Sequence, residues 1–292
     1  MDPGYIFAQL LMGLSSGMVL FLIASGLTII FGLLDIPNFA HGVLYMFGAY
    51  VTYYFASHML GGGFFIGLVA ATVSLAFLGA LLELLPLRRI YESPHALQLL
   101  MTFAFILILE DCAKFFWGTS FMSTKTPTLL AGRIVLPGAR EFPVYSAFII
   151  TCGFMVGIVL WLGMFRTKLG KMIQAARSNK EMLTALGINV PRLYTVVFMI
   201  GSALAGLAGG LASPLIAVSI GMGDAIIITV FAIIIVGGVG SLLGAFICSI
   251  LIGELNTFGT HLMPGFEMIF TYVLVIVILL TRPEGLFGKR LE

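Results

Sequence analysis

Apolar runs of eighteen or more residues recur from one end of this chain to the other, and each is long enough to cross a lipid bilayer as a helix. Of the 292 residues, 60% are hydrophobic and only 10% are charged. Lipid offers no hydrogen-bond partners, so only helices and closed barrels can cross it. A barrel strand alternates polar and apolar residues, whereas residues 225–236 read Ala-Ile-Ile-Ile-Thr-Val-Phe-Ala-Ile-Ile-Ile-Val. The sequence therefore predicts an all-α polytopic membrane protein.

Nine segments are candidate membrane spans. They lie at roughly 6–34, 38–58, 64–86, 95–117, 144–165, 193–213, 222–237, 240–258 and 266–281. Positively charged connections stay in the cytoplasm, which places there the arginines at 88–89, the segment 166–192 and the tail after Thr281. These three basic connections lie on the same side of the membrane only if the chain crosses it nine times and the N-terminus lies outside. An eight-span arrangement, in which 38–58 or 222–237 is re-entrant, stays open.

A polar, basic segment at 166–192 separates two apolar runs. The segment contains six of the chain's fifteen Lys and Arg residues: Arg166, Lys168, Lys171, Arg177, Lys180 and Arg192. Ser178 and Glu181 have the Ser-x-x-Glu spacing of a capping box, in which both side chains satisfy free N–H groups at a helix start. The helix should run to about Leu186, because Gly187 suits the left-handed C′ position and a proline follows closely. A short capped helix on the basic side resembles a coupling helix, the part of a transporter that an ATPase grips.

The connection 118–143 is the longest irregular stretch on the outer side. Pro127, Pro137 and Pro143 argue against a helix there. Two interpretations stay open: a solvated loop, and a docking surface for an external solute-binding protein.

Two breaks in the chain precede helices that are rich in small residues. In the first, Asn38 occupies an N-cap position and His41 lies one turn into the helix. A helix start carries partial positive charge and free N–H groups, so it can hold a carboxylate. This favours a pathway for an anionic or zwitterionic solute; the alternative is a kink that Asn38 caps. The second break, 237–241, precedes residues 242–253, and interrupted helices in matching halves are typical of a transport site.

Most acidic residues near the spans have structural explanations. Glu110 and Lys114 have the i, i+4 spacing of an ion pair, and Glu83 lies close to the arginines at 88–89. Glu254 is the least easily explained, because charge inside a membrane is expensive. The chain contains no hydrolase signature and no P-loop. We therefore predict that it is not an enzyme and that any ATP hydrolysis belongs to another polypeptide.

Four motifs follow one another along nearly the whole chain. They are Asn38-Phe39-Ala40-His41-Gly42, residues 181–185 with Gly187 and Ile188, residues 237–245, and Arg282-Pro283-Glu284-Gly285-Leu286-Phe287-Gly288. Together they resemble the LivH-type permeases, which are membrane subunits of branched-chain amino acid ABC importers.

The resemblance implies a single transmembrane permease domain over residues 1–292, with eight or nine helices, some of them interrupted, like the vitamin-importer (type II) class of ABC permeases. Its external loop would be 118–143 and its cytoplasmic coupling segment 166–192. The implied partners are a second, LivM-like permease or a second copy of this chain, two ABC ATPase subunits, an extracytoplasmic solute-binding protein and membrane lipid, but no nucleic acid. The chain would lie in the bacterial inner membrane. It would bind no cofactor itself, because ATP and Mg²⁺ belong to the ATPase subunits.

The motifs and the resemblance together assign the site residues. The substrate path is expected at Asn38, His41, Gly42, Gly240 and Ser241. ATPase coupling is expected at Ser178, Asn179, Glu181, Ala185 and Gly187. The solute stays open, because the binding protein supplies most selectivity in such systems. The alternatives are an ATPase-independent secondary carrier of small solutes, a structural membrane scaffold and a membrane enzyme.

Overall fold

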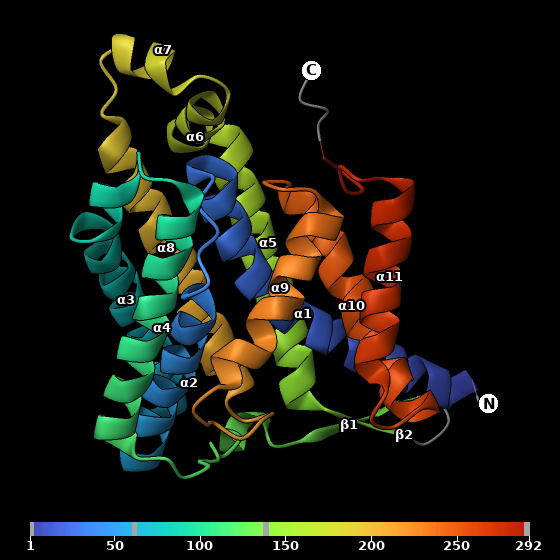
Figure 1. The fold of residues 1–292 in the computed structure, drawn as a ribbon. Coiled ribbons are helices and arrows are strands. Elements are labelled where there is room, and N and C mark those ends of the chain that lie inside the picture. The colour runs from blue at the N-terminus through green and yellow to red at the C-terminus, as the bar shows by residue number, and fades with distance from the viewer. Residues whose placement is uncertain (1–2, 60–62, 137–139, 289–292) are drawn as a thin grey trace.

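The computed structural model describes residues 3–59, 63–136 and 140–288, which form a bundle of helices with one small β-hairpin (Figure 1). The long helices are α1 (Pro3–Leu34), α2 (His41–His58), α3 (Gly63–Leu84), α4 (His95–Trp117), α5 (Val144–Arg166), α8 (Val190–Ala212), α9 (Met222–Gly237), α10 (Leu242–Leu262) and α11 (Glu267–Thr281). The shorter elements are η1 (Leu87–Ile90), η2 (Thr128–Leu130), β1 (Arg133–Leu136), β2 (Arg140–Pro143), α6 (Lys168–Ser178) and α7 (Lys180–Ala185).

Each segment that the sequence marked as a span forms a helix in the described part of the chain. Six of these helices are long and apolar enough to cross a membrane: α1, α3 with η1, α4, α5, α8 and α10. The apolar stretches of α9 and α11 are shorter, and α2 is not among the six. The all-α polytopic prediction is therefore confirmed. The number of crossings, eight or nine, and the type II class stay predictions.

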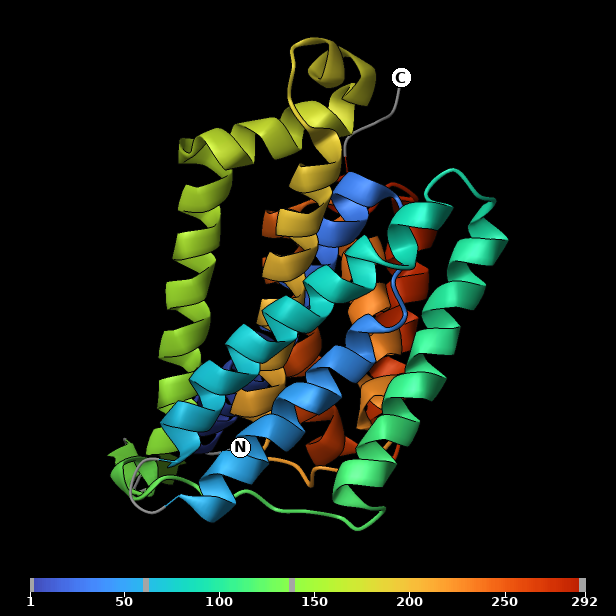
Figure 2. The same cartoon turned by 90° about the vertical axis from the view of Figure 1, so that its left-hand side faces the viewer.

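The basic connections gather at one end of the bundle, as the positive-inside rule requires. The turn with η1, the helices α6 and α7, and the end of α11 all lie there (Figures 1 and 2). The described start of α1 and the β-hairpin lie at the opposite end. We refer to these as the basic end and the hairpin end.

Helices α1 and α8 form the centre of the bundle. Most side chains of α1 from Met18 to Ile30 are buried, and α1 packs against α10, α8 and α5, while α8 also packs against α3 and α2. Glycine allows these helices to approach closely. A Cβ atom on Gly26 of α1 would lie only 2.6 Å from the carbonyl oxygen of Gly201 in α8. A larger residue at Gly26 would push the two helices apart.

The predicted break after the first helix is present, but its geometry differs from the expectation. Helix α1 ends at Leu34, and Asp35 turns the chain with a left-handed φ of 55°. The chain then runs without helical structure to a tight turn, and α2 begins only at His41. Asn38 is therefore not the N-cap: its backbone carbonyl, rather than its side chain, accepts a hydrogen bond from the His41 N–H at 3.2 Å. The N-cap position belongs to Ala40, which makes no side-chain cap.

The connection 118–143, at the hairpin end, is more ordered than an irregular loop. Strands β1 and β2 pair in antiparallel register, with Arg133 opposite Pro143 and Ile134 opposite Phe142. The three-residue helix η2 directly follows Pro127, and Pro137 lies outside the described residues. Met122 forms a β-bridge with Val218, which ties this connection to the segment before α9.

Candidate functional site

Inside the bundle, the starts of α2 and α9 meet. Gly42 in the first turn of α2 touches Gly223 in the first turn of α9 so closely that a Cβ atom on Gly223 would lie 2.5 Å from the Gly42 carbonyl oxygen. Just before α2, the ring of Phe39 packs against Phe231 of α9, with 4.6 Å between the ring centroids. We call this contact the α2–α9 junction. Two interrupted helices therefore direct their positive ends toward the same region of the interior.

His41 is fully buried at this junction. Its Nε2 lies 3.1 Å from the carbonyl oxygen of Ile23 in the middle of α1, and its Nδ1 has no hydrogen-bond partner among the described residues. Because a carbonyl oxygen only accepts, Nε2 must carry the proton in the neutral ring. Nδ1 is then a hydrogen-bond acceptor without a partner among the described residues.

Asn38 is also buried, with 2% of its surface exposed. Neither its Oδ1 nor its Nδ2 finds a partner within the described residues. Leaving a buried amide unpaired costs about 1–3 kcal/mol, so buried polar groups of this kind are usually satisfied by something in the working protein. Asn38 thus brings one unpaired donor group and one unpaired acceptor to the described interior.

The structure separates Gly240 and Ser241 from the three residues at the junction. Both lie in the turn between α9 and α10, at the basic end, where Ser241 is the N-cap of α10 and accepts a hydrogen bond from the Gly244 N–H at 3.1 Å. Gly240 has a φ of 73°, and its Cα would lie 2.6 Å from a Cβ atom on Gly32 of α1. The five predicted path residues therefore form two groups, one in the interior and one next to α6.

The segment 166–192 contains two helices, α6 and α7, rather than the single predicted one. Thr167 caps α6 by accepting a hydrogen bond from the Gly170 N–H at 3.1 Å. Ser178 is the last residue of α6, and its hydroxyl donates to the Gln174 carbonyl at 3.3 Å. Ser178 therefore does not cap the following helix.

The capping-box prediction was wrong by one residue. Asn179 is the N-cap of α7, and its Oδ1 accepts from the Met182 N–H at 2.8 Å. The Asn179 N–H already bonds to the Ala175 carbonyl in the last turn of α6, at 2.9 Å. Glu181 consequently has no free cap N–H to satisfy, although it lies in the first turn of α7, where a negative charge is favourable.

The predicted end of this helix is confirmed. Helix α7 ends at Ala185, and Gly187 has a left-handed φ of 81°. The Gly187 N–H bonds to the Thr184 carbonyl at 2.9 Å, and the Ile188 N–H bonds to the Leu183 carbonyl at 3.3 Å. This pair of hydrogen bonds is a Schellman motif, which satisfies the last carbonyls of a helix.

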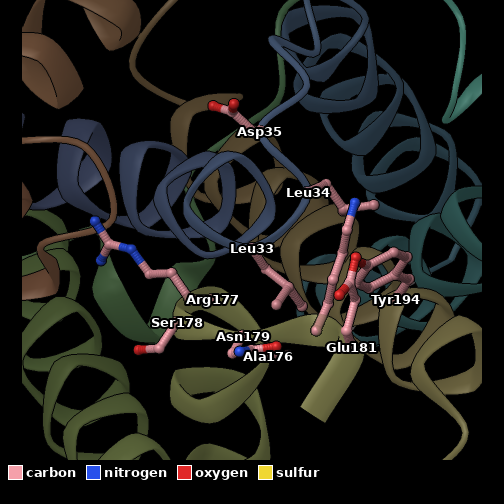
Figure 3. A pocket seen from close by; sticks show the side chains of 10 residues that line it. Leu33, Leu34, Asp35, Ala176, Arg177, Ser178, Asn179, Glu181 and Tyr194 are labelled. Carbon is pink, nitrogen blue, oxygen red and sulfur yellow. The ribbon is translucent and has the colours of Figure 1, made fainter. Parts of the chain in front are cut away.

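A cavity of about 360 Å³ lies between the end of α1 and the helices α6 and α7 (Figure 3). It is lined by Leu33, Leu34, Asp35, Ala176, Arg177, Ser178, Asn179, Lys180, Glu181 and Tyr194. The lining carries two acids and two bases, so its charge does not favour one sign of ligand. In Figure 3, the guanidinium of Arg177 points to the side away from Glu181 and Tyr194.

Glu83 is the centre of a buried polar cluster at the basic end. Its carboxylate accepts hydrogen bonds from Arg88 Nε at 3.2 Å and Nη2 at 3.1 Å, from the Tyr91 hydroxyl at 2.7 Å and from the Thr195 hydroxyl at 2.7 Å. The predicted contact with Arg88 is confirmed, whereas Arg89 makes no ion pair within the described residues. Desolvation of the Tyr91 hydroxyl raises its pKa, and the hydrogen bond to Glu83 raises it further. The cluster links α3 to α8.

The predicted pair of Glu110 and Lys114 does not form. Lys114 Nζ instead contacts Asp111 Oδ1 at 2.8 Å, and both of these side chains are exposed. Glu110 lies near Asp224 and the Gly221 amide, and its Oε1 is buried without a hydrogen-bond partner among the described atoms. The i, i+4 spacing was misleading, because Glu110 is directed toward the start of α9.

Long apolar helices, basic connections at one end and an interrupted helix pair in the interior define a polytopic membrane protein built like a transporter. Residues 9–279 match the family model described as the permease component of branched-chain amino acid transport systems. The chain belongs to this family. It is therefore a LivH-type permease subunit and not an enzyme, as predicted.

The curated relatives cover almost the whole chain. It is 28% identical to the high-affinity branched-chain amino acid transport system permease protein LivH of Escherichia coli K12, over 98% of this chain and 96% of the relative. It is 27% identical to the corresponding protein BraD of Pseudomonas aeruginosa, over 96% and 95% of the two chains. A probable LivH of Methanocaldococcus jannaschii is 28% identical over 92% of this chain and 89% of its own length. No solved structure matches the chain significantly.

Proposed function

We propose that this chain is the membrane subunit of an ATP-driven importer and forms half of the path for branched-chain or related amino acids. It would pair with a second, LivM-like permease or with a second copy of itself. Two ABC ATPase subunits would bind ATP and Mg²⁺ on the cytoplasmic side, and an extracytoplasmic solute-binding protein would deliver the solute. The relatives named above are branched-chain amino acid permeases, which supports this choice of solute and a place in the bacterial inner membrane.

The observation that carries the proposal is the helix pair α6–α7. It stands at the basic end, beyond the ends of the long helices (Figure 1). Both of its helices begin at capping residues, Thr167 and Asn179, and α7 closes with the Schellman motif, so the pair is a defined structural unit rather than a loose loop. Such a unit offers a partner subunit a defined surface to bind.

The exposed face of α7 fits a protein groove. Leu183 is buried against the bundle, whereas 62% of Met182 and 69% of Leu186 are exposed. These two apolar side chains lie among the polar residues of the basic end. An ATPase subunit that received them would grip α7 as an amphipathic helix in a groove.

The α2–α9 junction supports a path for a zwitterionic solute. The two helix starts favour a carboxylate there, and His41 Nδ1 can accept a hydrogen bond from an ammonium group. The Asn38 amide can form a hydrogen bond with either the carboxylate or the ammonium group of the solute. The close contact of Gly42 with Gly223 would let α2 and α9 shift against each other when access changes from outside to inside.

Reconstituted transport tests the proposal. The chain is placed in lipid vesicles with a LivM-like permease and two ABC ATPase subunits from its own organism, and uptake of radiolabelled leucine from a solute-binding protein is measured. We expect uptake that requires ATP and stops when the ATPase cannot hydrolyse it. Uptake by this chain alone, driven by an ion gradient, would instead support the secondary carrier.

A further inference from the structure

Arg177 connects α6 to the turn between α9 and α10. Its Nη2 donates a hydrogen bond to the Val239 carbonyl at 2.7 Å, and its Nη1 donates to the Gly240 carbonyl at 3.2 Å. Arg177 forms no ion pair with the described acids, so its charge is directed at these two backbone oxygens. Hydrogen bonds from a charged donor are roughly twice as strong as neutral ones.

The turn that Arg177 holds is also held from other sides. The segment after α11 pairs with the last residues of α9, directly before the turn, since the Leu286 N–H bonds to the Val236 carbonyl at 2.8 Å and the Phe287 N–H bonds to the Gly237 carbonyl at 3.2 Å. Gly32 at the end of α1 packs against Gly240. A turn held on several sides moves as a body with the start of α10 and the end of α9, rather than bending alone.

Helix α9 carries any movement of this turn into the interior. It has 16 residues and is therefore about 24 Å long. Its far end is Gly223, which touches Gly42 at the α2–α9 junction. At the basic end, α7 joins α6 through a single N-cap residue, Asn179. The contacts thus run without a gap from α7 to α6, Arg177, α9 and α2.

We propose that Arg177 is the positioning residue that transmits movement of α6–α7 to α9, and through α9 to the α2–α9 junction. This inference rests on the proposed function, because it needs an ATPase that moves α7. The planar guanidinium suits the role, since its two N–H groups reach two successive carbonyls at once. Lysine has one compact ammonium group and cannot span both oxygens in the same fixed geometry.

The test compares Arg177→Gln with Arg89→Gln in the complete reconstituted transporter. Arg89 is an exposed arginine of η1, outside the segment 166–192, and its side chain makes no ion pair with the described acids. Leucine uptake and ATP hydrolysis are measured on the same vesicles, and their ratio is the readout. We expect Arg177→Gln to assemble and hydrolyse ATP, but to lower uptake per ATP by about tenfold or more, the effect of losing one charge-assisted hydrogen bond. Arg89→Gln should keep the wild-type ratio.

Other outcomes would overturn the inference. If Arg177→Gln keeps the wild-type ratio, or lowers uptake and hydrolysis in equal proportion, the side chain does not transmit movement. If Arg177→Gln does not assemble, Arg177→Lys is scored in the same way, and an unchanged ratio there counts against the role. Absence of ATP-dependent uptake in the wild type overturns the proposed function itself, which distinguishes the two failures.

Discussion

Glu83 illustrates how a buried acid is accommodated at the edge of a membrane bundle. The desolvation of a carboxylate is costly, and pairing with one exposed arginine would not offset it. Here the carboxylate accepts hydrogen bonds from Arg88, Tyr91 and Thr195, so both of its oxygens are satisfied. The cluster holds the start of α8 against the end of α3, close to the point where α7 leads into α8.

Removing this carboxylate should destabilise the protein strongly. Glu83→Ala removes the acceptor of the Tyr91 hydroxyl and the counter-charge of the half-buried Arg88, while Arg88 and Thr195 keep the Pro191 carbonyl as an acceptor. We expect a loss of about 3 kcal/mol in the free energy of unfolding. The matched control is Glu141→Ala, which removes the acid of the exposed pair with Arg133 and should change stability by less than about 1 kcal/mol. Thermal unfolding in detergent measures the stability of both variants. Equal effects of the two substitutions would contradict the role given to Glu83.

Tyr91 makes part of this stability dependent on pH. Burial and the Glu83 carboxylate raise its pKa in the folded protein above the ordinary value of 10.0. As pH rises above about 10, the unfolded chain therefore loses this proton first, and the stability that Tyr91 contributes is present below that pH and lost above it. Tyr91→Phe should flatten this part of the alkaline decline in unfolding temperature. An unchanged decline would mean that other groups cause it.

At this scale the sequence predicted one local contact, Glu83 with Arg88, and was wrong about another, Glu110 with Lys114. The spacing of Glu83 and Arg88 indicated their contact, but nothing in the pattern pointed to Thr195, which lies 112 residues further on. The polar character of Asn38 was visible, yet its lack of a partner depends on how the chain enters the bundle. A side chain's partner is a property of the packing, and one sequence does not contain that information directly.

In the helix pair α6–α7, the end of one helix was predictable from the sequence and its start was not. The end of α7 was predictable, because only a glycine or a similar residue readily takes the left-handed conformation found at Gly187. The start was misplaced by one residue, because α6 was not foreseen and uses Ser178 for its own last turn. A capping pattern identifies a helix start only when the preceding residues are free of another helix.

Gly187 offers a test of this element. Nothing lies within 4 Å of a Cβ atom built there, so a larger residue would meet no neighbour and the cost would come from the backbone alone. We expect Gly187→Lys to strain the Schellman motif by about 1–2 kcal/mol and to abolish ATP-coupled uptake, while the protein still inserts into the membrane. Gly187→Asn, which tolerates the left-handed conformation better, should keep part of the uptake. Full uptake by the lysine variant would contradict the role of α7.

The α2–α9 junction predicts a sharp difference between two glycines. A methyl group on Gly42 would clash with the backbone of Gly223, whereas a methyl group on Gly163 in α5 would meet nothing within 4 Å. We expect Gly42→Ala to reduce uptake severely and lower the unfolding temperature. Gly163→Ala should be neutral or stabilising by up to about 1 kcal/mol, because alanine favours the helix. Similar behaviour of the two variants would show that the junction is looser than described.

For the whole molecule, hydrophobicity and charge were enough to predict the class of fold. Every predicted span is a helix, and the basic connections lie at one end, because water and lipid act on each segment separately. The arrangement of the helices was beyond such reasoning. The sequence grouped Gly240 with Asn38 as path residues, but the structure puts Gly240 beside Arg177 at the basic end. Which helices touch depends on tertiary packing between distant segments.

In the proposed transporter, a nucleotide-hydrolysing partner holds the exposed face of α7 in the cytoplasm. A photo-crosslinking amino acid at Leu186, which is 69% exposed, tests it directly in living cells, with the buried Leu183 of the same helix as the control position. We predict that the probe at Leu186 captures an ATPase subunit and that the probe at Leu183 does not. Capture of no ATPase from Leu186, or equal capture from Leu129 in η2, would show that the partner does not bind α7.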